Sequence, residues 1–320
     1  MGRAFHAFRS RRVRIAVNAV FVSVALGAAV VTVLHFVHSG WPLAHANPVL
    51  VVAAGLLFLA AYAFKAWGWQ RLFSPHERPQ ALTLAAAGGA ASVGGVALPG
   101  RFDEAIRIAV VRRLPGKTAG LGAICLTLIV VGLLDSAALA PLASVAAAAT
   151  ESGGVRVGFA LVALAGVAAA GLVLFLPRIA CFAFVTRFKV GRWLREHCAC
   201  RRSASEAWFL ISVSWALRAV AVFVLLNALS VGSSMPLALA FLCASAASAS
   251  LPIAPAGAAT QAGAGAAILI FSGIPKAEAV AFAVAAQALV ILVGAAVVAA
   301  AGIWHLAARF RPAQAVAPAA

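Results

Sequence analysis

Apolar runs long enough to cross a bilayer recur along this chain, and they constrain its fold more than any other feature. A helix needs about 20 consecutive apolar residues to cross a hydrocarbon core. Six runs reach or approach that length: residues 15–37, 48–64, 119–143, 157–177, 207–229 and 278–303. Charged residues make up only 10% of the sequence, against about 25% in ordinary soluble domains. The sequence therefore predicts an all-α polytopic membrane protein, with no stretch left for a soluble catalytic domain.

The positive charge of the chain predicts its orientation and does not indicate a nucleic-acid partner. The formal net charge is +17, but the Lys and Arg residues lie in short segments beside the apolar runs, where they favour the cytoplasmic face. Counted in this way, both termini are expected to be cytoplasmic. The five cysteines form no disulfide pattern, which is consistent with a reducing compartment.

The first apolar run, 15–37, has two interpretations. It follows a basic segment, as the apolar region of a secretory signal does, and Ala-His-Ala at 44–46 resembles a cleavage site. At about 22 residues the run exceeds the 7–15 residues of a signal's apolar region, so we expect a retained first span. We accordingly expect a basic cytoplasmic N-terminus at 1–14, one transmembrane domain at 15–305 and a disordered cytoplasmic tail at 306–320.

The run at 81–98 is predicted to be one arm of a re-entrant hairpin. Residues 65–78 and 101–117 are both basic, so a full crossing between them would place one of these clusters outside. A hairpin with 104–114 as its return arm keeps both clusters in the cytoplasm. Irregular backbone at membrane depth is tolerated only where protein or water covers it. The tip of this hairpin is therefore a candidate cavity.

A second hairpin, over 236–254 and 257–273, is expected to enter from the opposite face. The complete prediction is six full spans plus two re-entrant helical hairpins. The two halves, 15–146 and 157–303, are then related as an inverted-topology repeat, an arrangement typical of alternating-access transporters.

A short Pro/Gly block stands at each predicted hairpin. Pro99 and Gly100 mark the first copy, and Pro255 and Gly257 mark the second. With Gly100 aligned on Gly257, Glu104 falls on Gln261. A match this short also arises by chance in a chain rich in Ala and Gly. The hairpin topology favours a real duplication, because paired Gly/Pro interruptions point to a site near the membrane midplane.

Charged residues next to the first hairpin are candidates for headgroup binding. The planar guanidinium groups of Arg101 and Arg107 suit a phosphate, since each can donate to two of its oxygens. Glu104 can pair with either Arg or take a proton. The alternative is a solvated cytoplasmic loop that merely follows the positive-inside bias.

Two ionisable residues fall inside predicted spans. Asp135 follows Gly132-Leu-Leu, and Arg218 lies in the middle of the run at 207–229. Such residues are costly in the bilayer and usually functional. They either neutralise each other across the bundle, or Arg218 holds a lipid phosphate while Asp135 positions it or titrates.

No residue pattern indicates a metal, a cofactor or a catalytic centre. The spacing of His197, Cys198 and Cys200 is cramped for metal binding, and no second ligand pair follows. No nucleophile–base set is present, so we expect no enzyme. The predicted substrate-binding residues are Arg101, Glu104, Arg107, Asp135, Arg218 and Gln261.

Three segments together resemble the flippase-like transmembrane domain of lysylphosphatidylglycerol synthases. They are Trp67–Phe73, Leu98–Arg107 and Leu251–Gly257, and the resemblance covers about residues 10–305. It rests on the pattern Pro-Gly-Arg-x-x-Glu-x-x-Arg that begins at Pro99. In that family the second half reads Pro-Gly-Gly-x-Gly-x-x-Glu, and here Gln261 replaces the acid.

The resemblance implies binding and movement of an anionic phospholipid, a polyprenyl-phosphate lipid or a hopanoid-type lipid. The aminoacyl-transferase domain of the full-length synthases has no counterpart in this sequence, so lipid aminoacylation is not implied. We therefore expect a flippase-like lipid transporter. The alternatives are a membrane enzyme acting on a lipid phosphate or sugar, and a non-catalytic partner of a lipid-pathway enzyme.

Overall fold

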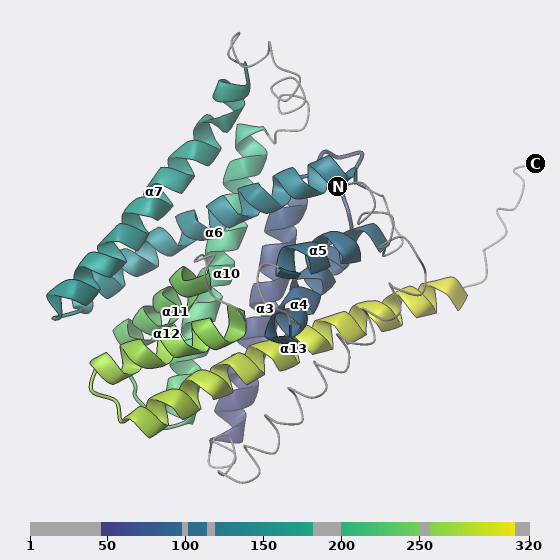
Figure 1. Cartoon of the computed structure of the whole chain (residues 1–320). Helices are drawn as coiled ribbons and strands as arrows, with labels where there is room; N and C mark the ends of the chain where they lie inside the picture. Colours follow the sequence, from purple (N-terminus) through teal and green to yellow (C-terminus); the bar gives the residue numbers. More distant parts are fainter. Residues whose placement is uncertain (1–45, 98–101, 114–118, 182–199, 250–256, 311–320) are drawn as a thin grey trace, which may run out of the picture.

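The described part of the protein is entirely helical (Figure 1). The computed structural model describes residues 46–97, 102–113, 119–181, 200–249 and 257–310. Every regular element in these ranges is an α-helix, nine in all, which confirms the all-α prediction for this part of the chain. The expected first span, 15–37, lies outside it.

Five of these nine helices are long and apolar enough to cross a membrane. They are α3 (Pro48–Arg71), α6 (Leu121–Ala149), α7 (Gly153–Cys181), α10 (Arg201–Ala228) and α13 (Lys276–Phe310). The other four are α4 (Ala81–Ala97), α5 (Phe102–Arg113), α11 (Met235–Ala249) and α12 (Gly257–Phe271). At 1.5 Å per residue these four are only about 18–26 Å long, shorter than the hydrocarbon core of about 30 Å.

Helices α3 and α10 pack antiparallel along their whole length. At one end the N–H of Asn47 donates to the carbonyl of Ala228 at 3.1 Å. At the other end Arg71 and Glu206 form an ion pair at 3.6 Å. Gly68 permits the close approach between them, because a Cβ at that position would lie 3.0 Å from a backbone oxygen of α10. The two helices are therefore in close contact from end to end.

The short helices form two pairs, α4 with α5 and α11 with α12 (Figure 1). Each pair also packs against a long helix from the other half of the chain: α4 lies on α13, and α11 lies on α6. Gly89 and Gly294 form the crossing of α4 and α13, where a Cβ on Gly89 would collide with the carbonyl of Gly294. Helix α7 packs along α6 on the outside.

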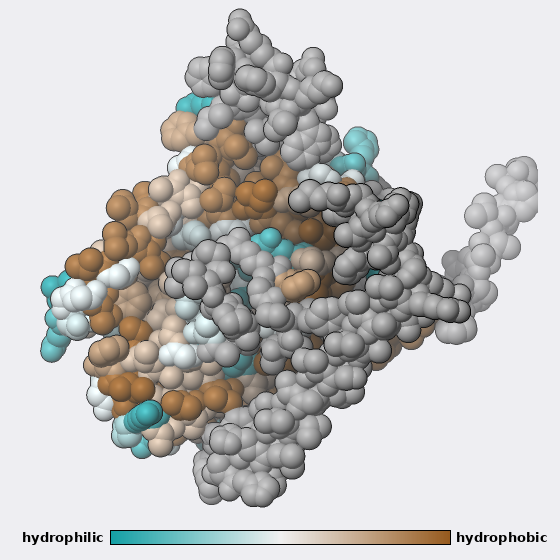
Figure 2. Space-filling model, in the orientation of Figure 1, coloured by the Kyte–Doolittle hydropathy of each residue, from teal (hydrophilic) through white to brown (hydrophobic). Residues whose placement is uncertain are grey.

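The pattern of burial is that of a protein surrounded by lipid. The most apolar window of α6 is 61% buried, whereas that of α7 is only 22% buried, so α6 is central and α7 is peripheral. Helix α7 exposes large apolar side chains, including Leu161, Leu164 and Phe175. Hydrophobic residues cover much of the described surface in Figure 2. A soluble protein rarely exposes apolar patches of this extent, so the chain is a multi-pass membrane protein.

The helices extend beyond several of the predicted spans. The second predicted span ends at 64, but α3 continues to Arg71 and so contains Lys65. Likewise, α10 begins at Arg201 instead of 207, and α13 ends at Phe310 instead of 303. Hydropathy detects only the apolar part of a helix, whereas backbone hydrogen bonding continues through Lys, Arg and aromatic residues at the membrane–water interface.

Candidate functional site: an ionisable cluster between α3, α6 and α10

Three ionisable residues of the candidate spans lie together. Lys65 comes from α3, Asp135 from α6 and Arg218 from α10. They are the 18th of 24, the 15th of 29 and the 18th of 28 residues of their helices, so none is at a helix end. A charged side chain near the centre of a membrane helix costs at least about 2.5–3.5 kcal/mol. The partners of each charge therefore decide what the cluster can do.

Asp135 is held by two different donors. Lys65 donates from Nζ to Oδ2 of Asp135 at 2.7 Å, and Trp215 donates from Nε1 to Oδ1 at 2.8 Å. The side chains of Lys65 and Asp135 are only 23% and 21% exposed. Water therefore screens this pair less than it screens a surface ion pair. Of the two arrangements considered for Asp135, pairing with Arg218 is not observed, because Lys65 takes that place.

Arg218 lies against aromatic rings. Its guanidinium carbon is 5.1 Å from the centre of the Trp215 ring and 5.7 Å from that of Tyr62, within the range of a cation–π interaction. Tyr62 is itself fixed by a hydrogen bond to Ser92 on α4. Among the described residues, no carboxylate forms an ion pair with Arg218. The rings therefore stabilise this charge without neutralising it.

Arg107 on α5 approaches the cluster from the side of the first short pair. It is half-buried and forms an ion pair with Asp103 at 3.3 Å, one helical turn earlier. The positive charges of Arg107 and Arg218 both act on Lys65. Helix α5 packs against α4 and α6, which explains this proximity. The cluster thus combines three cationic side chains.

The other predicted site residues are more scattered. Glu104 is exposed in the first turn of α5, where a carboxylate is favoured by the helix dipole. Gln261 is half-buried on α12, in the second short pair. Arg101 lies outside the described residues. The structure therefore brings Arg107, Asp135 and Arg218 together around Lys65.

Lys65, Tyr62 and Trp215 are the cluster residues that sequence reasoning missed. The sequence pattern places Lys65 in a basic cytoplasmic segment that follows a span, whereas in the structure Lys65 lies well inside α3. A helical spacing signal was present: Tyr62 and Lys65 are three residues apart on α3, and Trp215 and Arg218 are three apart on α10. Residues three apart share one face of a helix. The sequence signal of this site is therefore an aromatic residue followed three positions later by a cation, once at the end of an apolar run and once inside one.

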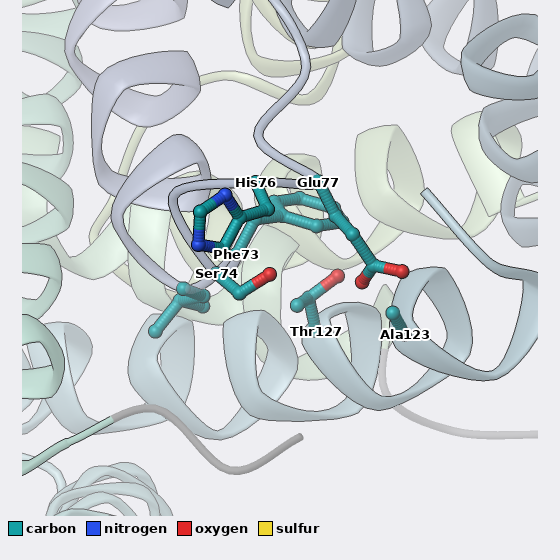
Figure 3. A pocket seen from close by; sticks show the side chains of 7 residues that line it. Phe73, Ser74, His76, Glu77, Ala123 and Thr127 are labelled. Carbon is teal, nitrogen blue, oxygen red and sulfur yellow. The ribbon is translucent and has the colours of Figure 1, made fainter. Parts of the chain in front are cut away.

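A separate polar hollow lies where α3 ends and α6 begins (Figure 3). Its volume is about 280 Å³, and its lining includes His76, Glu77 and Thr127. The Thr127 hydroxyl accepts a hydrogen bond from Nε1 of Trp69 at 3.0 Å. Phe73 and Leu72 supply its apolar side. None of the predicted substrate-binding residues lines this hollow, so it is distinct from the cluster.

Metal ligands do not gather anywhere in the described ranges. No group of three or more His, Cys, Asp or Glu side chains is placed to hold an ion there. Cys200 is exposed at the start of α10. The other two residues of the sequence cluster, His197 and Cys198, lie outside the described residues.

Comparison with known families agrees with this architecture. The family model described as the lysylphosphatidylglycerol synthase TM region matches residues 19–298, which include the whole cluster. No curated protein and no solved structure matches the chain. The resemblance predicted from the sequence is thereby confirmed. This multi-pass membrane protein belongs to the lysylphosphatidylglycerol synthase TM region family.

Proposed function

We propose that this protein binds an anionic or polyprenyl-type lipid and moves it across the bacterial inner membrane. Arg218 carries the proposal. It is a half-buried guanidinium inside a candidate span, in contact with two aromatic rings and without an ion-pair partner among the described residues. A lipid phosphate is the anion that a bilayer supplies at such a site. Arg binds phosphate through two parallel hydrogen bonds.

Each neighbour of Arg218 has a role in this proposal. Lys65 and Arg107 add positive charge, and Asp135 fixes the position of Lys65. Arg101, Glu104 and Gln261 are proposed to meet the headgroup at the two short helix pairs. The acyl or prenyl chains stay in the surrounding lipid. No cofactor, metal or nucleic acid takes part, and the protein is not an enzyme in this scheme.

We further propose that the two halves form an inverted repeat with both termini in the cytoplasm. Support comes from the order of the helices, which is long, short, short, long in α3–α6 and again in α10–α13. The packing is reciprocal as well, since α4 lies on α13 and α11 lies on α6. Two halves related by a two-fold axis are expected to pack in this way. The four short helices then form hairpins that enter from opposite faces.

Cysteine labelling tests this topology. In a variant without native cysteines, Arg112→Cys at the end of α5 is expected to react with a membrane-impermeant reagent only from the cytoplasmic side. Ser272→Cys after α12 is expected to react only from the opposite side. Both positions are exposed in the structure, so the label can reach them. Labelling of both from one side would contradict the inverted arrangement.

The transport proposal is tested with purified protein in vesicles that contain labelled anionic lipids. Arg218→Gln is expected to lower lipid movement about tenfold or more, because a hydrogen bond to a charged group contributes about 1.5–3 kcal/mol. Arg201→Gln is the matched control, since Arg201 is exposed at the first turn of the same helix. Thermal unfolding of both variants verifies that the fold is kept. Equal transport by Arg218→Gln and wild type would contradict the assignment.

The same assay separates the two alternative functions. Chemical conversion of the lipid without movement would favour a membrane enzyme that acts on a lipid phosphate or sugar. Neither conversion nor movement by a folded protein would favour a non-catalytic partner of a lipid-pathway enzyme.

A further inference from the structure

The charges of the cluster add up to one cation in excess. Among the described residues, the cationic members are Lys65, Arg107 and Arg218. Two of them have a carboxylate partner: Lys65 pairs with Asp135 at 2.7 Å, and Arg107 pairs with Asp103 at 3.3 Å. Arg218 has aromatic partners only. One positive charge therefore remains for a ligand to neutralise.

Charge balance matters more here than at a protein surface. The side chains of Lys65 and Asp135 are less than a quarter exposed, and lipid surrounds the helices that carry them. Removing a charge from water without a partner is costly in such a place. A ligand with one negative charge leaves no charge uncompensated. A ligand with two negative charges leaves one of its own charges uncompensated.

The packing also disfavours an added ammonium group. A zwitterionic headgroup needs a carboxylate whose charge is not yet balanced, but Asp135 already pairs with Lys65 and also accepts a hydrogen bond from Trp215. Asp103 is already paired with Arg107. Glu104 is exposed on α5, where water screens its charge. The cluster thus suits the anionic part of a headgroup and has no described site for a cationic one.

We infer that the cluster selects a phosphodiester, which carries one permanent negative charge, over a phosphomonoester or a pyrophosphate. A phosphomonoester carries about −1.5 to −2 at pH 7, and a pyrophosphate carries more. This inference rests on the proposed lipid function and specifies the charge of its substrate. The phosphodiester comes either from a glycerophospholipid or from a polyprenyl phosphosugar, which share this group.

The test compares four lipids with the purified full-length chain in neutral vesicles at pH 8. Phosphatidylglycerol and a polyprenyl phosphosugar present a phosphodiester, phosphatidic acid presents a phosphomonoester, and phosphatidylethanolamine is zwitterionic. Phosphatidylglycerol or the phosphosugar, the two phosphodiester lipids with a net charge of about −1, is expected to bind about tenfold or more tightly than phosphatidic acid or phosphatidylethanolamine, since an uncompensated charge costs more than the 1.4 kcal/mol of a tenfold step. The preferred phosphodiester identifies the source.

Variants that change the charge count make the test specific. Asp135→Asn raises the excess to two and is expected to shift the preference toward phosphatidic acid. Lys65→Met removes the excess and is expected to abolish the preference for anions. The double variant Lys65→Met/Asp135→Asn returns the excess to one, so the phosphodiester preference is expected to return. Arg201→Gln, outside the cluster, is expected to behave as wild type.

Two failures are distinguishable. If the wild type binds or moves lipids but phosphatidic acid competes as well as phosphatidylglycerol and the phosphosugar, the charge inference is wrong while the lipid function stands. The inference is also wrong if the double variant behaves like either single variant although it is folded. If the folded wild type neither binds nor moves any of the four lipids, the proposed function itself is wrong.

Discussion

The two short helix pairs have similar architecture but different chemistry. In each pair the first helix, α4 or α11, is rich in small residues and packs against a long helix of the other half. Helix α5 carries five charged residues: Asp103, Glu104, Arg107, Arg112 and Arg113. Helix α12 carries none, and Gln261 is the residue that aligns with Glu104. The same packing arrangement therefore accommodates a helix pair with many charged residues and a helix pair with none on its second helix.

The comparison shows where the two halves divide their roles. Lys65, Arg107 and Asp135 all come from the first half, so most of the cluster's charge comes from there. The second half supplies Trp215 and Arg218 on α10, which packs against α3. Helices α11 and α12 complete the bundle with small and apolar residues. The predictions below test this division, beginning with the largest expected effect.

The largest effect is expected from breaking the ion pair of the first half. Asp135→Leu leaves Lys65 without its carboxylate partner inside the bundle, and a broken buried pair costs about 3–5 kcal/mol. We therefore expect the free energy of unfolding to fall by about 3 kcal/mol, measured by denaturant titration in detergent micelles. Lys65→Met/Asp135→Leu removes both charges and is expected to recover most of the loss.

Gln261→Leu is the matched change in the second half. Gln261 is half-buried and hydrogen-bonds to none of the described residues. The free energy of unfolding of the Gln261→Leu variant is therefore expected to differ from that of the wild type by less than about 0.5 kcal/mol. A loss as large as that of Asp135→Leu would mean that α12 also contributes an essential polar contact. The proposed division between the halves would then be wrong.

Three glycines probe the packing of the short helix pairs. A Cβ at Gly89 meets the backbone of Gly294, which cannot move aside, so Gly89→Ala is expected to destabilise the fold by about 1–3 kcal/mol. At Gly265 the nearest atoms belong to the side chains of Phe241 and Ser245, so Gly265→Ala is expected to cost less. Gly263 faces open space, and Gly263→Ala is expected to stabilise α12 by about 0.5–1 kcal/mol.

Thermal unfolding in detergent measures this series. The order expected is Gly89→Ala lowest, then Gly265→Ala, then wild type, then Gly263→Ala. Equal effects at Gly89 and Gly265 would mean that the contact between α11 and α12 is as rigid as the crossing of α4 and α13. The two short helix pairs would then be equally rigid, although they differ in charge.

The sequence predicted the membrane architecture well because hydropathy reports it directly. All five candidate spans in the described residues, and all four shorter helices, overlap segments expected from apolar runs and Gly/Pro breaks. The family was also predicted, from the Pro-Gly-Arg pattern at Pro99. Helix ends were less accurate, because backbone hydrogen bonds continue past the apolar residues that a hydropathy window detects.

The cluster itself was predicted only in part. Asp135 and Arg218 stood out because they interrupt apolar runs. Lys65 did not, since it follows the apolar run of α3 and has the sign that the positive-inside bias expects. Which cation pairs with Asp135 depends on how α3, α6 and α10 are placed around one another. That placement comes from tertiary packing between residues 70 positions apart, which no local pattern contains.

The last comparison concerns two tryptophans that make similar hydrogen bonds in different surroundings. Nε1 of Trp215 donates to the ionised Asp135 at 2.8 Å, whereas Nε1 of Trp69 donates to the neutral hydroxyl of Thr127 at 3.0 Å. A hydrogen bond to a charged group contributes about 1.5–3 kcal/mol, and one between neutral groups about 0.5–1.5 kcal/mol.

Each Trp→Phe change removes the donor and keeps an aromatic ring. Trp215→Phe is therefore expected to lower both the free energy of unfolding and anionic lipid binding, because Asp135 then loses one of its two donors next to Lys65 and Arg218. Trp69→Phe is expected to lower stability slightly and to leave lipid binding unchanged. Equal losses of lipid binding in the two variants would place the binding site at the hollow beside Thr127 instead of at Arg218.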